Sequence, residues 1–353
     1  MLKRNLLIIL TIIIAVPKVN ACTSFCFSKN GKHYFGKNYD WFAESGMIII
    51  NHKGLSKTSE VRKDGNTISW VSKYGSVTFN QYGKEFPSGG MNEKGLVIEL
   101  MWLSETQYPK KDKRASLDEL QWIQYQLDNS ATIEDVINSD ELIRITSNGV
   151  PLHFLVADTS GNTATIEFLN GKLVTRTKKN IPFSVLTNST YKKSINKTVK
   201  NTAKKLEKPS FKANSFSRFA TTCKLIDNIK RNEKGNSIKA AFNILNKVKQ
   251  GSFTKWSIVY DICERKIYFK SFSSNQLKNI EFDSINFNCT AAPLCIELDA
   301  DFKGNINNKL KVFNDRINAL VLEKSIQQSA SQIKLNESFK KRRLKYIEHI
   351  KCH

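Results

Sequence analysis

Residues 22–41 of this chain read CTSFCFSKNGKHYFGKNYDW, and this stretch sets the first expectations for the fold. Two largely apolar runs flank Lys29-Asn30-Gly31, which is a strong turn signal. We therefore predict a pair of short strands over Thr23–Ser28 and Lys32–Gly36. The first strand starts directly after Cys22, which places that cysteine on a rigid sheet edge rather than on a loose tail.

The segment before Cys22 has the three parts of a secretory signal peptide. Lys3-Arg4 is positively charged, Leu6–Val16 is apolar, and Val19-Asn20-Ala21 offers small or modest residues before a cut. The apolar run is too short to span a bilayer and remain there. We expect residues 1–21 to be removed on export to the periplasm or the cell exterior, so that Cys22 becomes the first residue.

A cysteine at the first position carries its own base. The α-amino group titrates near pH ~8 and the thiol near ~8.5, so nucleophile and proton acceptor belong to one residue. A lipid anchor, in which the thiol is alkylated, is an equal alternative on these residues alone, although the bulky Asn20 fits that pattern poorly. A purely structural thiol is the third interpretation.

The charge is strongly positive, with 55 Lys and Arg against 32 Asp and Glu and a formal net charge of +23. Such a balance attracts nucleic acid, membrane surfaces or acidic substrates. Much of it is scattered lysine, with runs at Lys110–Lys113, Lys204–Lys208 and Lys340–Arg343. The export signal and the absence of a nucleic-acid motif favour a solvated surface. Membrane contact is expected only through a lipidated Cys22 or this basic surface.

The seven cysteines of the chain contain no Cys-x-x-Cys pair, and no histidine spacing suits zinc. We therefore expect no metal and no cofactor. Cys289 and Cys295 are close enough in the sequence to form a disulfide, but the spacing does not prove one.

The rest of the chain alternates between strand and helix patterns. Further strands are predicted over Gly95–Leu103, Leu152–Ala157, Ala164–Phe168, Lys172–Arg176, Trp256–Ile262 and Lys266–Phe272. Helices are predicted after the capping-box pattern Ser116-x-x-Glu119, and over Ile133–Asn138, Ser217–Ile229, Ile238–Val248 and one or two parts of Lys309–Lys351. Residues 192–214 are polar and lysine-rich and are interpreted as an exposed loop. This alternation predicts a layered α+β domain.

Five short motifs then resemble one family in order and spacing. They are Cys22-Thr23-Ser24-Phe25, Phe35-Gly36-Lys37-Asn38-Tyr39-Asp40-Trp41, Gly90-Met91-Asn92-Glu93-Lys94-Gly95-Leu96, Leu186-Thr187-Asn188-Ser189 and Ser217-Arg218-Phe219. Together they resemble the choloylglycine hydrolase family of linear-amide hydrolases, which includes penicillin V acylases and bile salt hydrolases. The likeness spans roughly residues 22–300.

The resemblance implies an N-terminal-nucleophile fold, an αββα sandwich of two antiparallel sheets between helical layers. It implies a domain over residues 22–304, while residues 305–353 carry no matched motif. We interpret that last segment as a C-terminal helical extension that packs on the domain or contacts another copy, so a homo-oligomer is possible.

The resemblance also implies roles for individual residues. Cys22 would attack an amide carbonyl to form a thioester, with its own amino group moving the proton. Asp40 would hold that amino group by a hydrogen bond, and Asn188 would donate to the developing oxyanion. Arg218 would contact Asp40 or the cysteine, where a cation favours the thiolate.

Each role has a simpler alternative. Asp40 is also acceptable as a turn aspartate, and Arg218 as a surface helix residue. Asn188-Ser189-Thr190 is a glycosylation sequon, and a glycan there would be incompatible with an oxyanion role.

Two positions depart from the family pattern. Lys37 stands where arginine is usual, so it keeps the charge but loses the bidentate fork. Trp102 stands where bile salt hydrolases have asparagine and some penicillin acylases tyrosine, although only its backbone N–H is needed for the oxyanion. Trp41 and Trp102 are either core residues or flat walls for an aromatic or long acyl group.

We therefore expect an exported cysteine amidohydrolase that acts on a small-molecule N-acyl amide of the penicillin V kind or another type, with bile-salt conjugates less favoured. A non-catalytic, lipid-anchored envelope protein on the same fold is the alternative. A weaker third hypothesis is a binder of anionic polymers or membranes, whose binding would be sensitive to salt.

Overall fold

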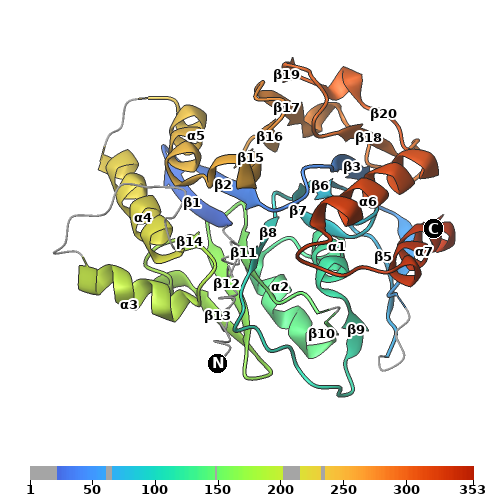
Figure 1. The fold of residues 1–353 in the computed structure, drawn as a ribbon, viewed down its shortest axis with the longest axis horizontal. Coiled ribbons are helices and arrows are strands. Elements are labelled where there is room, and N and C mark those ends of the chain that lie inside the picture. Colours follow the sequence, from blue (N-terminus) through green and yellow to red (C-terminus); the bar gives the residue numbers. More distant parts are fainter. Residues whose placement is uncertain (1–21, 61–65, 148, 202–214, 232–234) are drawn as a thin grey trace, which may run out of the picture.

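The computed structural model describes residues 22–60, 66–147, 149–201, 215–231 and 235–353, and side chains are described through residue 199 of the third range (Figure 1). Two large sheets face each other, with helices outside both of them. Phe79 of the second sheet meets Tyr260 and Phe269 of the first at centroid distances of 6.3 and 5.8 Å. Such contacts between rings place the hydrophobic core between the two sheets.

The first large sheet has seven strands, and its neighbours pair antiparallel except for the last two. Its order is β14 (Val185–Leu186), β1 (Thr23–Lys29), β2 (Lys32–Asp40), β15 (Thr254–Asp261), β16 (Lys266–Ser271), β17 (Lys278–Glu281) and β19 (Gly304–Asn305). Three helices lie on its side of the molecule: α3 (Tyr191–Asn201), α4 (Ser215–Arg231) and α5 (Ser237–Val248).

The second large sheet has nine strands, all antiparallel to their neighbours. Its order is β13 (Lys172–Thr177), β12 (Thr163–Leu169), β11 (Leu152–Ala157), β8 (Val97–Trp102), β7 (Pro87–Asn92), β6 (Ser76–Asn80), β3 (Met47–Asn51), β18 (Leu294–Glu297) and β20 (Lys311–Val312). The helices on this side are α1 (Glu119–Asn129), α2 (Ile133–Asn138), α6 (Asp315–Ser329) and α7 (Glu337–Tyr346).

Two small sheets complete the described fold. The parallel pair β9 (Ala115–Leu117) and β10 (Ile143–Ile145) is one. The other has the order β21 (Lys351–Cys352), β4 (Leu55–Thr58) and β5 (Ser69–Val71). The whole arrangement is the predicted α+β sandwich of two stacked sheets between helical layers.

Strand β3 shows how one strand serves two layers, because successive side chains alternate between its faces. Ile48 and Ile50 belong to the main core, whereas Met47 and Ile49 pack with Val321 of α6. Helix α6 therefore covers the outer face of the nine-stranded sheet.

The predicted hairpin at the start of the described chain is confirmed. Asn30 and Gly31 have φ values of 51° and 72°, the positive values that a two-residue hairpin turn needs. Phe25 pairs with Gly36 across the strands, and a Cβ on that glycine would lie 2.3 Å from the Phe25 ring. Strand β1 also pairs with β14, so Cys22 adjoins an interior strand and not the sheet edge that we predicted.

Most predicted elements lie within two or three residues of the observed ones, and two local predictions were wrong. Ser116 is in strand β9, and Asp118 caps helix α1 by accepting from the backbone N–H groups of Leu120 and Gln121. The helix begins at Glu119, so Asp118 is the residue directly before it and can cap its first amides, whereas Ser116 lies two residues further back. The exposed loop predicted over 192–214 contains most of helix α3, while residues 202–214 lie outside the described residues.

The C-terminal segment has two helices within the region where we predicted one or two, and it also contributes strands to two sheets. Strand β20 extends the nine-stranded sheet beside β18, and β21 pairs with β4. In Figure 1 this segment lies against the nine-stranded sheet and α1.

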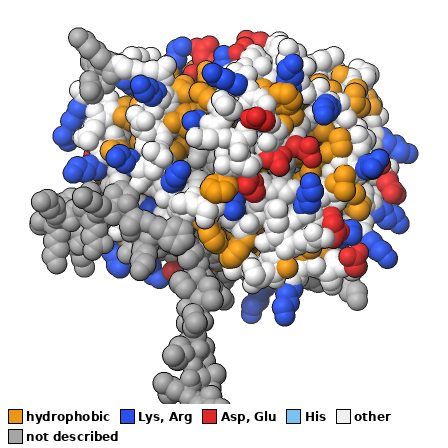
Figure 2. Space-filling view, turned by 45° about the horizontal axis from the view of Figure 1, so that its top comes forward, with side chains coloured by type: hydrophobic (Ala, Val, Ile, Leu, Met, Phe, Trp, Pro, Cys, Tyr) orange, Lys and Arg blue, Asp and Glu red, His pale blue; other side chains and the backbone are white. Residues whose placement is uncertain are grey.

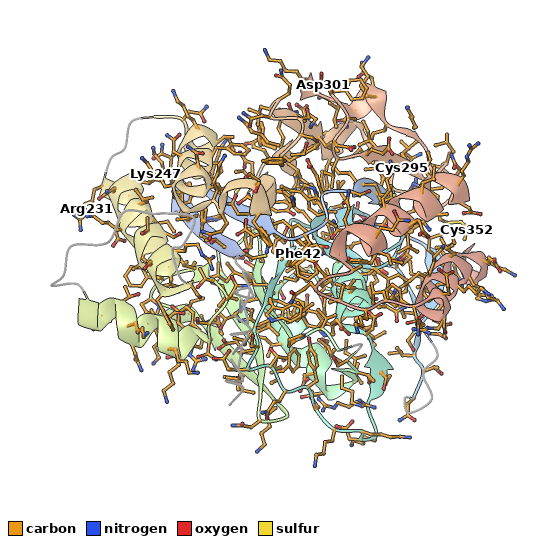
Figure 3. The ribbon with its side chains drawn as sticks, viewed as in Figure 1. Phe42, Arg231, Lys247, Cys295, Asp301 and Cys352 are labelled. Carbon is orange, nitrogen blue, oxygen red and sulfur yellow. A yellow bond between two sulfur atoms is a disulfide. The ribbon has the colours of Figure 1, made fainter. Side chains whose placement is uncertain are left out.

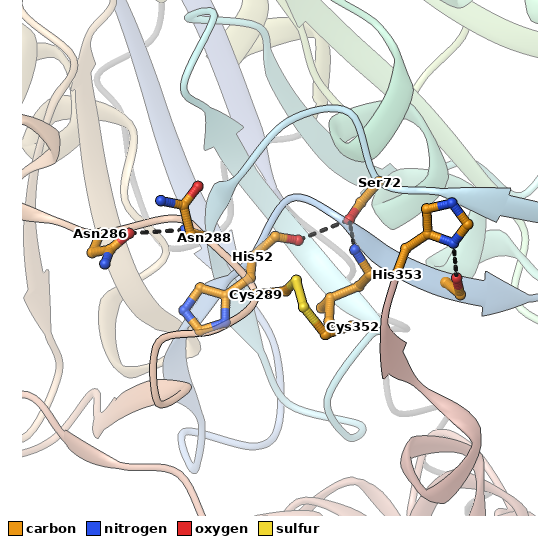
Figure 4. The surroundings of a disulfide bond; sticks show 9 residues. His52, Ser72, Asn286, Asn288, Cys289, Cys352 and His353 are labelled. Atoms are coloured by element: carbon orange, nitrogen blue, oxygen red, sulfur yellow. Dashed lines mark hydrogen bonds between the residues drawn. A yellow bond between two sulfur atoms is a disulfide. The ribbon is translucent and has the colours of Figure 1, made fainter.

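The suggested pairing of Cys289 with Cys295 is wrong, because Cys289 is bonded to Cys352 with a Cα–Cα distance of 5.4 Å (Figure 4). Cys295 is a buried free thiol at the sheet face, away from Cys352 in Figure 3. Cys295 pairs with Ile49 and packs in the cluster under α6, whereas Cys289 lies beside Gly54. The disulfide fastens the chain end beside β4, where His353 N also donates to Gly54 O.

The basic side chains do not gather into one patch on the face shown in Figure 2, where Lys and Arg alternate with acidic and apolar groups. Several described lysines have acidic partners, as in the 2.8 Å pair between Lys193 and Glu105. No described helix is long and apolar enough to cross a membrane.

Replacing Cys352 by serine is expected to lower the free energy of unfolding by about 2–4 kcal/mol, because the bridge closes a separation of 63 residues and restricts the unfolded chain. Thermal melts with and without reductant measure the effect. Reductant should lower the Tm of the native chain but leave that of Cys352→Ser unchanged. Peptide mapping that recovers Cys289 linked to Cys295 would contradict the assignment.

Candidate functional site

Cys22 lies at the base of a cavity between the two sheets, directly before strand β1. Only 4% of its surface is exposed, and its Sγ lies 3.7 Å from the backbone oxygen of Asp40. Burial raises the pKa of the Cys22 thiol, while the charges of Lys37 and Arg218 act in the opposite direction. The thiol is therefore close to two buried cations and one buried carboxyl group.

Arg218 joins three parts of the site from the first turn of α4. Its Nη1 donates to Cys22 O at 2.5 Å and to Thr23 Oγ1 at 2.7 Å. Its Nη2 donates to Asn188 Oδ1 at 3.0 Å. The guanidinium is 2% exposed, so it is not the surface helix residue that was the alternative. It fixes the Cys22 backbone relative to the Asn188 amide.

Asn188 follows β14 and has both ends of its amide engaged. Arg218 holds Oδ1, and Nδ2 donates one proton to Trp102 O at 2.9 Å. Because an amide nitrogen carries two protons, one remains for a substrate oxygen. The segment is anchored behind Asn188, where His153 Nε2 lies 2.7 Å from Thr187 O.

Asp40 ends strand β2 beside Cys22. Its Oδ1 accepts from Thr254 Oγ1 at 2.5 Å, and its buried Oδ2 has no hydrogen-bond partner among the residues that the structure describes. Burial raises the pKa of Asp40 to about 6, against the opposing effects of Arg218, Thr254 and Lys37. This carboxyl group can accept a hydrogen bond from a nearby amino group.

Lys37 reaches across the core from the first sheet to the second. Its Nζ donates to Leu100 O and lies 3.9 Å from Glu99 Oε2. Tyr260 donates to Glu99 Oε1 at 2.5 Å, and burial raises the pKa of Glu99 to about 7 despite Lys37 and this tyrosine. The absence of a side chain at Gly89 makes space for Glu99, since a Cβ at residue 89 would lie 2.4 Å from the Glu99 carboxyl carbon.

The cavity beside Cys22 is lined mainly by apolar side chains. Trp41 and Trp102 both line it and stack with a centroid distance of 6.1 Å and an interplanar angle of 29°. Phe42, near the centre of Figure 3, meets Trp41 edge to face at 5.7 Å. The two tryptophans therefore pack against neighbouring rings and also line the cavity. Both interpretations made from the sequence, core residue and cavity wall, apply to them.

All six candidate residues predicted from the sequence are brought together here: Cys22, Lys37, Asp40, Trp102, Asn188 and Arg218. Sequence reasoning missed Thr254 and Glu99, the partners of Asp40 and Lys37. Neither has a local signal, since each is a polar residue in an ordinary strand pattern. No group of three His, Cys, Asp or Glu side chains in the described ranges is arranged to hold a metal ion.

Comparison with solved structures shows that this fold is shared with a penicillin V acylase and a conjugated bile acid hydrolase. Penicillin V acylase from Agrobacterium tumefaciens aligns with a TM-score of 0.73 and 24% identity, covering 83% of this chain and 98% of that one. A variant of conjugated bile acid hydrolase from Clostridium perfringens aligns with a TM-score of 0.64 and 20% identity, covering 83% and 97%.

The family is shown by the sequence. The model of linear amide C-N hydrolases, choloylglycine hydrolase family, matches residues 22–295, so the chain belongs to this family. A penicillin V acylase from Pectobacterium atrosepticum is 31% identical over 194 residues, a match over 48% of this chain and 49% of that protein. The match therefore spans about half the length of this curated relative.

The double substitution Lys37→Met/Glu99→Gln is expected to raise the pKa of the Cys22 thiol, because it removes a cation that favours the thiolate. The pH dependence of Cys22 alkylation by iodoacetamide, followed by peptide mass, measures this. The pair is replaced together because Lys37→Met alone would leave Glu99 buried without a counterion.

Glu99→Gln alone is the matched control, since it retains the lysine, whose Nζ still donates to Leu100 O. Its alkylation inflection should lie at a lower pH than that of the double variant. Equal inflections in the two proteins would show that Lys37 does not act on the thiol.

Proposed function

We propose that this protein is exported, is cleaved before Cys22, and hydrolyses the carbon–nitrogen bond of small N-acyl amides with Cys22 as the nucleophile. The observation that carries the proposal is the unpartnered, buried Oδ2 of Asp40 beside Cys22. Removal of residues 1–21 would create an α-amino group at Cys22, which is a donor for this oxygen. Family membership sets the reaction class, and the disulfide is typical of an exported protein.

The first half of the proposed reaction forms a thioester. Cys22 Sγ attacks the amide carbonyl while the thiol proton passes to the α-amino group. Asn188 Nδ2 donates to the oxyanion, an interaction worth about 3–4 kcal/mol in comparable sites. When the C–N bond breaks, the proton moves from the Cys22 ammonium to the leaving amine.

The second half releases the acid. A water molecule gives a proton to the α-amino group and attacks the thioester carbonyl. The C–S bond then breaks, and the sulfur takes the proton back. Asp40 stabilises the ammonium in both halves, because it accepts a hydrogen bond and carries the opposite charge.

The tryptophan-lined cavity favours an apolar or aromatic acyl group of the kind found in penicillin V over a bile-salt conjugate. The buried position of Cys22 supports the nucleophile over a lipid anchor, because a diacylglyceryl group on this sulfur would have to occupy the cavity. The scattered lysines of Figure 2 give no single surface for an anionic polymer on that face.

Replacing Cys22 by alanine is expected to reduce hydrolysis at least about a thousandfold, because the nucleophile is lost. The assay uses the exported chain and penicillin V, and follows release of the amine. Cys26→Ala is the matched control, since Cys26 is equally buried in β1 but does not line the cavity. It should remain active.

The intact mass of the exported chain checks the N-terminus. An unmodified chain that begins at Cys22 agrees with the proposal, while a diacylglyceryl increment would favour the lipid-anchored alternative. Full activity of Cys22→Ala would overturn the proposed mechanism.

The pH dependence of kcat/KM tests the role of Asp40. The ammonium group of an N-terminal Cys22 would lower the pKa of Asp40 from its value of about 6. Because protonated Asp40 no longer stabilises that ammonium, we expect kcat/KM to fall at a pH below about 6. Thr254→Val removes the donor to Asp40 Oδ1, favours the neutral acid and should move the acid limb to higher pH.

Thr254→Ser keeps the hydroxyl group and should restore the original limb. An identical acid limb in the valine and serine variants would show that another group controls it.

A further inference from the structure

One wall of the Cys22 cavity comes from a part of the chain that the family model does not match. Ile333, Leu335, Phe339 and Arg343 line the same cavity as Cys22. The family match ends at residue 295, so these four side chains lie beyond it. In Figure 1 the loop between α6 and α7, together with α7, lies beside α1.

This wall is fixed to the body by buried charges. Arg343 is 1% exposed, donates to Asp118, and donates through Nη1 to Glu60 Oε2 at 3.3 Å. Its guanidinium lies 3.4 Å from the centroid of the Phe86 ring. An arginine with two carboxylate partners and an aromatic face keeps α7 in one position.

A chain of hydrogen bonds also links the C-terminal segment to a tryptophan of the cavity. Trp41 Nε1 donates to Tyr82 OH at 2.7 Å, and Tyr82 OH donates to Ser329 Oγ at 3.0 Å. Tyr82 packs in one cluster with Phe339 and Leu322. The end of α6 therefore supports the Trp41 side of the cavity as well.

The rest of the lining is largely apolar too, and includes Leu100, Leu120 and Leu152. The two charged side chains away from Cys22 already have protein partners. Glu119 Oε1 accepts from Val150 N at 3.2 Å, and Arg343 is paired as described. The space therefore suits a group without charge.

We propose that Ile333, Leu335 and Phe339 form an acyl-binding wall that makes the protein prefer extended, uncharged, apolar acyl groups. This inference rests on the proposed amide hydrolysis and specifies its substrate class. The acyl chain would lie between this wall and the body of the cavity, with its carbonyl group at Cys22. The amine part would then remain on the solvent side.

The test uses N-acyl p-nitroanilides with acetyl, hexanoyl, decanoyl and phenoxyacetyl groups, so that only the acyl part varies. We expect kcat/KM to rise with acyl length in the native exported chain. Leu335→Ala and Ile333→Ala should each lower kcat/KM for the decanoyl substrate about tenfold, the scale of lost apolar contacts in a pocket. Both should affect the acetyl substrate less, because an acetyl group is too short to reach the wall.

The chain offers matched controls in the same cluster. Leu344 and Ile326 pack against the same cluster as Leu335 and Ile333 but are not among the residues that line the cavity. Leu344→Ala and Ile326→Ala should keep the native ratio of decanoyl to acetyl hydrolysis, even if they lower stability. A wall variant with the same ratio as its control would overturn the inference.

Binding separates this inference from the proposed function. Calorimetric titration of decanoate into the Cys22→Ala chain should show binding that Leu335→Ala weakens about tenfold and Leu344→Ala does not. If the native chain hydrolyses none of the amides, the function fails while this binding result still supports the wall. If the native chain hydrolyses the amides but the wall variants change neither decanoate binding nor the ratio of decanoyl to acetyl hydrolysis, the acyl-binding wall is wrong and the proposed function stands.

Discussion

The site depends first on the guanidinium group of Arg218, which is the one contact shared by Cys22, Thr23 and Asn188. Strand β1, the segment after β14 and helix α4 come from different parts of the sequence, and this side chain links all three at the site. A planar group with five donors can hold several acceptors at once. Loss of this side chain would therefore disturb the position of the nucleophile and that of the amide donor together.

Several charged groups are buried around this contact, and burying charges is costly unless they are paired. Lys37 and Glu99 lie 3.9 Å apart across the two sheets, and Asp40 accepts a hydrogen bond from the hydroxyl of Thr254. The same low-polarity surroundings raise the pKa of Asp40 and of Glu99. The buried Oδ2 of Asp40 has no partner among the described residues, and the proposed α-amino group of Cys22 would supply one.

The C-terminal segment contributes to the cavity from beyond the part of the chain that the family model matches. Its helices pack on the outside of the nine-stranded sheet. The loop between them lines the cavity together with Trp41 and Tyr82. Buried pairs of Arg343 and the Cys289–Cys352 bridge hold this segment at two places. A wall supplied by a separate segment allows the acyl preference to change while the residues around Cys22 remain in place.

The sequence by itself determined the local elements and the identity of the candidate site. The Asn30-Gly31 turn predicted the hairpin of β1 and β2. The motifs around Cys22, Asp40, Asn188 and Arg218 predicted a site whose residues lie together in the structure. Only the tertiary structure decided which distant side chains complete it. Thr254, Glu99 and the wall residues have no local pattern, and Cys289 pairs with Cys352 instead of the nearer Cys295. Hydrophobic periodicity reports which face of an element is buried, but it does not report which partner lies against that face.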